Sequence, residues 1–446
     1  MNKFAQLLYS YCPYYFKHLF ANLRGRQLRY LRYGKKTKHW IQLAEEREYW
    51  TTNQWNDWHE AQLSKLIDKA QKTKYYKINN YNYKNIPILD KQALRKNNSD
   101  FVVESIKKIN LFKDYTSGTT GTPISIFLKR ETIQLWYALV ERRWRNWYGL
   151  SRKDKWAIFG GQTIINQKNS SPPYWIKNFS LNQIYFSVYH ISSHTIKYYV
   201  KALVDFKPQY IYGYASSLYN IAYEAMQQGL VLPKVKIVLN NGEILTNQQK
   251  KLISNAFQAP CRDTYGMSET VAAASECKYG KLHAWPETGI WEILDKKNNL
   301  IINGKVGKLI STGLINKDMP LLRYDTGDLI AIDKNYNCKC SRTLPIITYI
   351  EGREDDCILT SDGRKVGRLD PVFKSNLNIK EAQIIQESIS SFIINVVPEK
   401  NYTIKDEKKI ISELQKRIGD VRIEIEKFDA IPRDNSGKFK SVISKL

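Results

Sequence analysis

The chain has 446 residues, of which 43% are hydrophobic, so it can form two or three folded domains and is not intrinsically disordered. Its formal net charge of +26 favours anionic partners, such as nucleic acid, an acidic membrane surface or a phosphorylated substrate. Six cysteines do not indicate a disulfide framework in a chain of this length, and no apolar run suits a signal peptide or a membrane-spanning helix, so we expect a cytoplasmic protein.

Residues 1–40 form a basic leader with nine Lys or Arg side chains and no Asp or Glu. Tyr and Phe side chains are interleaved with these charges, and Pro13 prevents one continuous helix. Rings at headgroup depth and cations that meet anionic lipid are typical of interfacial segments. We therefore expect peripheral attachment to the inner leaflet of a membrane, with a merely solvated basic face and nucleic-acid binding as alternatives. We expect no nucleic-acid partner, because no recognised nucleic-acid module is present.

Residues 41–72 have the apolar spacing of helices, and we assign residues 1–85 to the leader and to helices that pack on a large domain. Further along the chain, short apolar runs such as 156–159 and 235–239 alternate with longer helical stretches. This alternation predicts an α/β fold with a mainly parallel sheet, which we place at residues 86–351.

A turn rich in Gly, Arg and acidic residues at 351–356 begins a different region. There we predict a small α+β domain at residues 352–446, with a strand at 391–397 and an amphipathic helix at 405–419. The turn suits a hinge, although an ordinary loop is the alternative.

Residues 115–123 read Tyr-Thr-Ser-Gly-Thr-Thr-Gly-Thr-Pro and are suited to holding a polyphosphate. The glycines let the backbone approach anionic oxygens, and the hydroxyl groups can donate hydrogen bonds to them. No Gly-Lys-Ser/Thr follows, so this is not the P-loop of kinases and GTPases. A surface turn rich in Ser, Thr and Gly is the alternative interpretation.

Four more motifs follow in order. Residues 241–243 (Asn-Gly-Glu) come directly after an apolar strand, where loops of an α/β sheet face the ligand crevice. Residues 265–270 offer an aromatic face for a base, a hydroxyl for a phosphate and a carboxylate for a divalent cation. Residues 322–328 end in an acid suited to ribose hydroxyls, and residues 431–438 place one lysine after a tight turn.

With these five motifs in order, the chain resembles the adenylate-forming, or acyl-activating, enzymes. More narrowly it resembles the phenylacetate–CoA ligase and CapK branch, whose CapK-like members are associated with capsular polysaccharide biosynthesis. The similarity extends from about residue 86 to residue 438. It implies a large N-terminal adenylation domain, a small mobile C-terminal domain, and the use of ATP and Mg²⁺.

The resemblance also implies individual roles. Asp328 would hold the ribose hydroxyls with help from Arg353, Glu269 would bind Mg²⁺, and Asp355 would lie at the hinge. Lys438 would stabilise the charge that develops as a carboxylate attacks the α-phosphorus of ATP. The β- and γ-phosphates would be wrapped by Thr116, Ser117, Gly118, Thr119, Thr120 and Gly121. The adenine and the α-phosphate would contact Gly242, Glu243, Tyr265, Gly266, Met267 and Ser268.

Two segments resemble family segments that face the carboxylate substrate, and they nominate Gly161, Tyr214 and Ser216 for the acyl pocket. Their polar character suits a hydroxylated substrate, while ordinary loops between sheet and helix are the alternative. The substrate stays open among phenylacetate, a sugar acid, a hydroxy acid and an amino acid.

Three cysteines and one histidine can complete a tetrahedral structural zinc site. Here they are Cys277, His283, Cys338 and Cys340, and some members of the branch have a similar set. Such a zinc ion would fasten a loop to the sheet without taking part in the chemistry. Four ordinary side chains are the alternative interpretation.

We therefore expect an ATP-dependent ligase that forms an acyl-adenylate and passes the acyl group to CoA, an amine or a hydroxyl, in capsular or surface polysaccharide biosynthesis. One alternative is an aryl–CoA ligase of the phenylacetate type. Another is a non-catalytic, nucleotide-binding scaffold of the capsule machinery. The sequence does not predict the oligomeric state.

Overall fold

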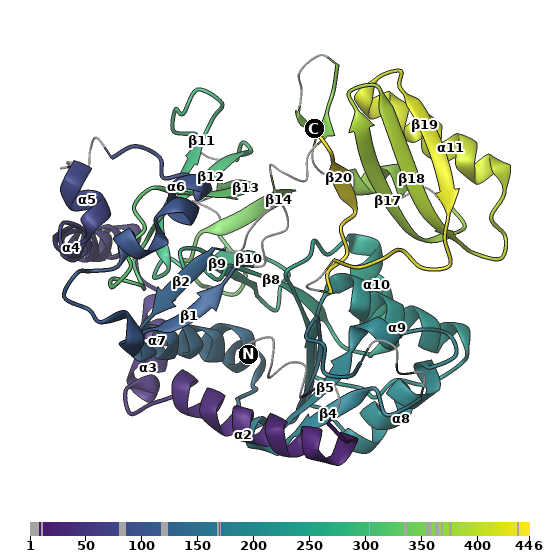
Figure 1. Ribbon diagram of the computed structural model, residues 1–446, viewed down its shortest axis with the longest axis horizontal. Coiled ribbons are helices and arrows are strands. Elements are labelled where there is room, and N and C mark those ends of the chain that lie inside the picture. The colour runs from purple at the N-terminus through teal and green to yellow at the C-terminus, as the bar shows by residue number, and fades with distance from the viewer. Residues whose placement is uncertain are drawn as a thin grey trace.

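The computed structural model describes residues 9, 12–79, 86–116, 124–166, 169, 171–302, 304–333, 337–353, 358–361, 365–366, 369–373, 377–434 and 437–446. Twelve strands form one large sheet, and four strands near the C-terminus form a separate sheet (Figure 1). The predicted α/β fold, with a large N-terminal part and a smaller C-terminal α+β part, is confirmed.

The large sheet combines a parallel and an antiparallel half. In order across the sheet, its strands are β11 (Gly289–Leu294), β12 (Gly307–Gly313), β13 (Tyr324–Asp333), β14 (Ile346–Arg353), β10 (Leu282–Ala284), β9 (Ala273–Glu276), β8 (Cys261–Gly266), β7 (Ile237–Asn241), β6 (Tyr210–Gly213), β3 (Trp156–Gly160), β5 (Gln183–Ser187) and β4 (Trp175–Asn178). The run from β8 to β5 is parallel, and the remaining neighbours pair antiparallel. The parallel half thus presents the carboxyl ends of β3, β6 and β7 at one edge, where ligands of α/β sheets bind.

The parallel strands are hydrophobic on both faces because both faces are covered. On one face they pack against α8 (Ile196–Phe206), α9 (Ala215–Gln227) and α10 (Asn247–Ala256). On the other face, Trp156, Tyr210 and Ile237 contact Trp144 and Tyr148, which follow α7 (Arg130–Val140). Because side chains pack on both faces, the parallel strands are held firmly in place, and so are the loops at their carboxyl ends.

The N-terminal helices are α2 (Tyr14–Arg32), α3 (Thr37–Arg47), α4 (Thr52–Ala70), α5 (Lys74–Asn79) and α6 (Lys91–Lys96), and a hairpin follows with β1 (Phe112–Tyr115) and β2 (Ser125–Leu128). Pro13 is the N-cap of α2, as expected for a residue that cannot continue a helix from before it. The helical pattern at 41–72 is divided between α3 and α4. The helix restarts at Thr51, whose side chain and that of Gln54 form a capping box.

The C-terminal sheet has the order β19 (Arg422–Lys427), β18 (Ser391–Pro398), β17 (Ile379–Ser388) and β20 (Val442–Ser444). The short strands β15 (Ile358–Leu359) and β16 (Lys365–Val366) pair with each other. Helix α11 (Ile404–Ile418) packs Ile410, Leu414 and Ile418 on this sheet. The predicted strand at 391–397 and helix at 405–419 therefore agree with the structure. Figure 1 shows this unit above α9 and α10.

Candidate active site and metal centre

The turn that carries Lys438 lies against the loops at the edge of the parallel strands. Gly437 has a φ of +76°, and a Cβ there would lie 2.7 Å from Gly161 Cα, so the close approach requires glycine. Within the turn, Gly437 N donates to Asp434 O at 2.9 Å and Lys438 N donates to Asp434 Oδ1 at 3.0 Å. The Lys438 amine reaches Gly242, where a Cβ would lie 3.2 Å from Nζ.

Glu243 fastens this turn to the large domain. Its carboxylate accepts hydrogen bonds from Ser216 N at 2.8 Å, Ser216 Oγ at 3.1 Å and Phe439 N at 2.7 Å. Burial raises the pKa of Glu243, while these donors act in the opposite direction. All three contacts are N–H or O–H donors to the carboxyl oxygens, an arrangement that stabilises the ionised form against the effect of burial. The side chain predicted for the adenine side thus has its partners within the protein, beside Lys438.

Polar contacts hold the small C-terminal unit against α9. Tyr223 Oη donates to Glu399 Oε1 at 2.9 Å, and Lys380 forms an ion pair with Glu224 at 2.5 Å. Asn220 Nδ2 donates to Glu381 Oε1 at 3.3 Å, and the same carboxylate pairs with Arg433 just before the Lys438 turn. These contacts set the orientation in which Lys438 enters the site.

A cavity of about 330 Å³ lies beside the Lys438 turn. It is lined by Ile158, Phe159, Gly160, Gly161, Gln162, Tyr185, Tyr212, Gly213, Tyr214 and Asn241. Two residues nominated for the acyl pocket, Gly161 and Tyr214, are among them. Ser216 is not a lining residue, because it is buried and holds Glu243.

The cavity wall is more aromatic than the sequence suggested. Tyr185 and Tyr212 had not been nominated, and they follow from the strand pairing, which sets side chains of β5 and β6 beside those of β3. Burial raises the pKa of both phenols, so their hydroxyl groups stay protonated at neutral pH. Tyr185 Oη accepts a hydrogen bond from Gln162 N at 3.1 Å. The cavity therefore offers flat apolar surfaces together with hydroxyl groups.

Two buried carboxyl groups occupy the predicted nucleotide side. Tyr265 Oη donates to Asp328 Oδ2 at 2.5 Å, which joins the residue expected at the base to the one expected at the ribose. Tyr324 Oη donates to Glu269 Oε1 at 2.8 Å. Thr270, the next residue, has a φ of +59°, a strained conformation for a β-branched residue that is found mainly at functional sites.

The other residues nominated for the nucleotide site have fewer described contacts, or lie outside the described residues. Ile124 N donates to Thr116 Oγ1 at 3.0 Å, a contact between the described residues on either side of the predicted phosphate loop. Arg353 lies opposite Asp328 in the β13–β14 pair, and Met267 packs on the core around Tyr324. Gly266 ends β8, and the partly buried Ser268 follows it. Outside the described residues lie Ser117, Gly118, Thr119, Thr120, Gly121 and Asp355.

A cation that the sequence did not nominate, Lys91, lies beside Gly327, the residue before Asp328. Gly327 has a φ of +73°, and a Cβ there would lie 2.4 Å from Lys91 Nζ. Lys91 is the first residue of α6, and only the tertiary fold brings it next to Gly327. No sequence motif distinguishes it from the many other lysines of this chain.

The four predicted zinc ligands come together. The ligand atoms of Cys277, His283, Cys338 and Cys340 all lie within 4.8 Å of one another. Cys277 Sγ and Cys338 Sγ are 3.7 Å apart, and Cys340 Sγ is 3.4 Å from His283 Nε2. Tetrahedral zinc, about 2.3 Å from sulfur and about 2.0 Å from nitrogen, separates its ligand atoms by about 3.4–3.8 Å. The four side chains therefore fit a zinc ion.

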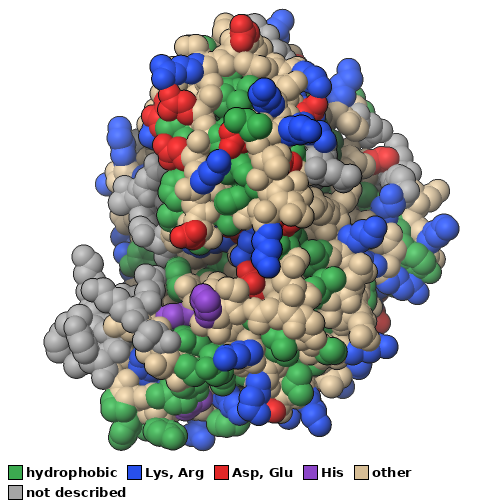
Figure 2. Space-filling model, turned by 90° about the vertical axis from the view of Figure 1, so that its right-hand side faces the viewer, with side chains coloured by type: hydrophobic (Ala, Val, Ile, Leu, Met, Phe, Trp, Pro, Cys, Tyr) green, Lys and Arg blue, Asp and Glu red, His purple; other side chains and the backbone are tan. Residues whose placement is uncertain are grey.

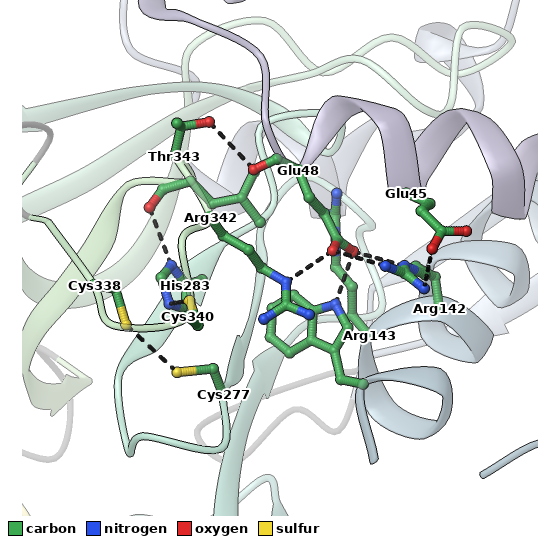
Figure 3. A network of polar contacts seen from close by, with 12 residues as sticks. Glu45, Glu48, Arg142, Arg143, Cys277, His283, Cys338, Cys340, Arg342 and Thr343 are labelled. Atoms are coloured by element: carbon green, nitrogen blue, oxygen red, sulfur yellow. Dashed lines mark hydrogen bonds and ion pairs between the residues drawn. The ribbon is translucent and has the colours of Figure 1, made fainter. Parts of the chain in front are cut away.

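The surroundings of the cluster also suit a metal. His283 Nδ1 is 3.1 Å from Leu344 O, a contact that orients the ring with Nε2 toward the cysteines. In Figure 3 the cluster lies beside a second network centred on Glu48, which sequence reasoning missed. Arg342 and Thr343, just after Cys340, both contact Glu48.

Glu48 is a completely buried acid held by several donors. It accepts from Arg142 Nε at 2.9 Å, from Arg342 Nε at 2.8 Å and from Trp147 Nε1 at 2.7 Å. Thr343 N donates to its carbonyl oxygen at 3.0 Å. Glu48 therefore connects the N-terminal helices to the residues that follow Cys340. It lies at the end of α3, where the helical pattern is interrupted before Thr51.

Known proteins resemble the chain throughout its length. Residues 358–445 match the family model of the CapK C-terminal domain. The chain is 26% identical to Protein CapK of Staphylococcus aureus over 98% of this chain and 99% of that one. It is 26% identical to phenylacetate-coenzyme A ligase of Pseudomonas putida over 55% of each chain.

Solved structures share the fold. The crystal structure of 2-hydroxyisobutyryl-CoA ligase in the postadenylation state, in complex with R3-HIB-AMP, superposes with a TM-score of 0.67 at 18% identity, covering 90% of this chain and 92% of that one. The same ligase in the thioesterification state superposes with a TM-score of 0.54 at 19% identity, covering 90% and 91%. The chain therefore superposes more closely on the postadenylation structure of that ligase than on its thioesterification structure.

The predicted resemblance to the adenylate-forming enzymes, and among them to the phenylacetate–CoA ligase and CapK branch, is confirmed by these comparisons. The prediction of an AMP-forming ligase agrees with the same fold and relatives.

Proposed function

We propose that this protein is an ATP-dependent ligase that converts a carboxylate to an acyl-adenylate and then transfers the acyl group to an acceptor. The position of Lys438 carries the proposal. Its amine lies at Gly242 and near the ring of Tyr214, which lines the aromatic cavity, and this position supports a role for the cation where a bound carboxylate would attack the α-phosphate of a nucleotide. A cation there stabilises negative charge that develops when two anions react.

The chain's own residues support each requirement of this step. The backbone around Gly161 and the ring of Tyr214 bound the cavity, and Glu243 holds the Lys438 turn against it. Tyr265 and Asp328 form the side proposed for base and ribose. Glu269 is the acid proposed to bind Mg²⁺, which when bound would neutralise phosphate charge.

The cavity narrows the class of carboxylate. It is lined by rings and phenolic hydroxyls, which suit an aromatic or hydroxylated group. We propose an aryl or hydroxylated acid ahead of a long-chain fatty acid. CoA is the first acceptor to test, because structures of 2-hydroxyisobutyryl-CoA ligase with the same fold contain CoA. A role in capsular polysaccharide biosynthesis rests on the similarity to Protein CapK.

We also propose that Cys277, His283, Cys338 and Cys340 bind a structural zinc ion, since their spacing fits one. Cys277 follows β9, which runs antiparallel to β8, so it lies toward the edge of the sheet away from Gly242 and the Lys438 amine. We therefore assign the ion to folding of the β9–β10 region. The two separate sheets support the proposed division into residues 1–85, 86–351 and 352–446, with a hinge at Asp355, although β14 of the large sheet extends to Arg353, two residues past the proposed boundary.

Carboxylate-dependent exchange of radiolabelled pyrophosphate into ATP tests the proposal, with aryl acids, hydroxy acids, amino acids, uronic acids and fatty acids as substrates. We expect exchange with one class and none without a carboxylate. ATP binding without exchange for any acid would instead favour the non-catalytic scaffold of the capsule machinery.

A further inference from the structure

The first long helix, α2, has one face fixed to the protein body. Tyr14 Oη donates to Trp175 O at 2.9 Å, and Asn178 Nδ2 donates to Ala21 O at 2.8 Å. At Gly25 a Cβ would lie 2.3 Å from Asn178 Oδ1, so glycine lets the helix lie directly on the edge strand β4. The inner face of α2 therefore already has its partner, and its outer face has a defined orientation.

The outer face of α2 carries large apolar side chains. Each of them is between 48% and 84% exposed. We call them the outer stripe: Tyr15, Phe16, Leu19, Phe20, Leu23 and Tyr30. Their spacing of three, four and seven residues puts them on one side of a helix. Figure 2 shows hydrophobic side chains gathered at the lower margin of the molecule, with Lys and Arg close by, where Figure 1 places α2.

The charged side chains of α2 all have one sign. Arg24, Arg26 and Arg29 are exposed on the same helix, and helical geometry puts Arg24 and Arg29 at opposite margins of the stripe. Residues 1–40 contain no acidic side chain. Among the described residues no helix is long and apolar enough to cross a bilayer, so the outer stripe can lie on a membrane but α2 cannot span one.

Charge distinguishes between two candidate partners of the outer stripe, a second copy of this chain and an anionic membrane. A second copy packed stripe to stripe would bring two arginine clusters together with no acid on either helix to compensate. An anionic bilayer supplies the opposite charge at its surface and an apolar layer just beneath it. We propose that α2 docks this protein on an anionic membrane, with the outer stripe in the headgroup region and the arginines at lipid phosphates.

Vesicle co-sedimentation of the full-length protein tests this docking and requires neither ATP nor substrate, so its failure would leave the proposed ligase activity untouched. We expect binding to phosphatidylcholine vesicles that contain phosphatidylglycerol and weak binding to phosphatidylcholine alone. Added salt should weaken the binding, because it screens the arginines. Phe16→Ser with Phe20→Ser should lower the partition coefficient at least about tenfold.

The matched control is Ile109→Ser with Val231→Ser, two apolar side chains that are more exposed than Phe16 or Phe20 and lie elsewhere. It should bind vesicles like the wild type. The side chains of both pairs are exposed, so both double variants should keep the wild-type melting temperature. If the Phe16/Phe20 variant melts at a lower temperature, Leu19→Ser alone replaces it in the vesicle experiment. Equal binding by the stripe variants and the control, or no binding by the wild type, would overturn the proposal. A wild-type dimer that Phe20→Ser dissociates, without vesicle binding, would assign the stripe to a second copy.

Discussion

Replacing Glu243 with glutamine tests how Lys438 is held in the site. The carboxylate accepts three hydrogen bonds at 2.7–3.1 Å, one of them from Phe439 N next to Lys438. Glutamine keeps one acceptor oxygen, and its NH₂ group replaces the other and faces a donor, either Ser216 N or the pair Ser216 Oγ and Phe439 N. At least one of the three hydrogen bonds is therefore lost. A hydrogen bond to a charged group contributes about 1.5–3 kcal/mol, which corresponds to about 10- to 150-fold slower adenylate formation if it holds the turn in place.

The assay is carboxylate-dependent ATP–pyrophosphate exchange, with Glu424→Gln as the matched control. Glu424 lies on β19 in the same C-terminal unit, exposed and paired only with its neighbour Arg422 among the contacts described. We expect Glu243→Gln to reduce kcat with the melting temperature kept within a few degrees, and Glu424→Gln to change neither. Exchange within twofold of the wild type in Glu243→Gln would refute the reasoning that this carboxylate positions Lys438.

Three further changes test the rest of the structure. Cys340→Ser should remove the zinc found by elemental analysis and lower the melting temperature, whereas Cys12→Ser should do neither; a metal-free wild type would contradict the zinc site. Glu48→Gln should lower the free energy of unfolding in urea by about 3–5 kcal/mol, since among the described residues Glu48 is the acid that pairs with the mostly buried Arg342, and Arg142 would keep only Glu45; a loss below about 1 kcal/mol would contradict that. Burial raises the pKa of Asp263 from 3.8 to about 7, so the folded state binds the proton of this carboxyl group more tightly than the unfolded state does. The protonated side chain therefore stabilises the fold at low pH, and this contribution to the free energy of unfolding is lost as the pH rises from about 4 to about 7. The free energy of unfolding of Asp263→Asn relative to wild type should therefore increase between about pH 4 and pH 7, and parallel pH profiles would contradict this.

Residues in local motifs could be predicted from the sequence. The turn that presents Lys438 and the loop that contains Gly242 are encoded by glycines and polar residues within a few positions, and the structure brings the two together. Cys338 and Cys340 were recognisable by residue type, although only the pairing of β9, β10 and β14 carries Cys277 and His283 to them.

Residues whose role depends on tertiary contacts could not be predicted. Glu48 is one acid in a run of charged residues, and its burial follows from Arg142 and Arg342, far along the chain. Tyr185 and Tyr212 look like ordinary strand residues until strand order places them around one cavity. The exposed stripe of α2 was foreseen only as an aromatic and basic leader, because sequence cannot tell which face of a helix the protein covers.

Direct detection of the adenylate tests the central claim most closely. The protein would be mixed with ATP, Mg²⁺ and the carboxylate that supports exchange, with no acceptor, and the quenched mixture examined by mass spectrometry. We predict acyl-AMP and pyrophosphate from the wild type, and at least about a hundredfold slower formation by Lys438→Ala, whose ATP binding is retained. Acyl-AMP formation by Lys438→Ala at the wild-type rate, or ADP in place of AMP products, would contradict the proposed mechanism.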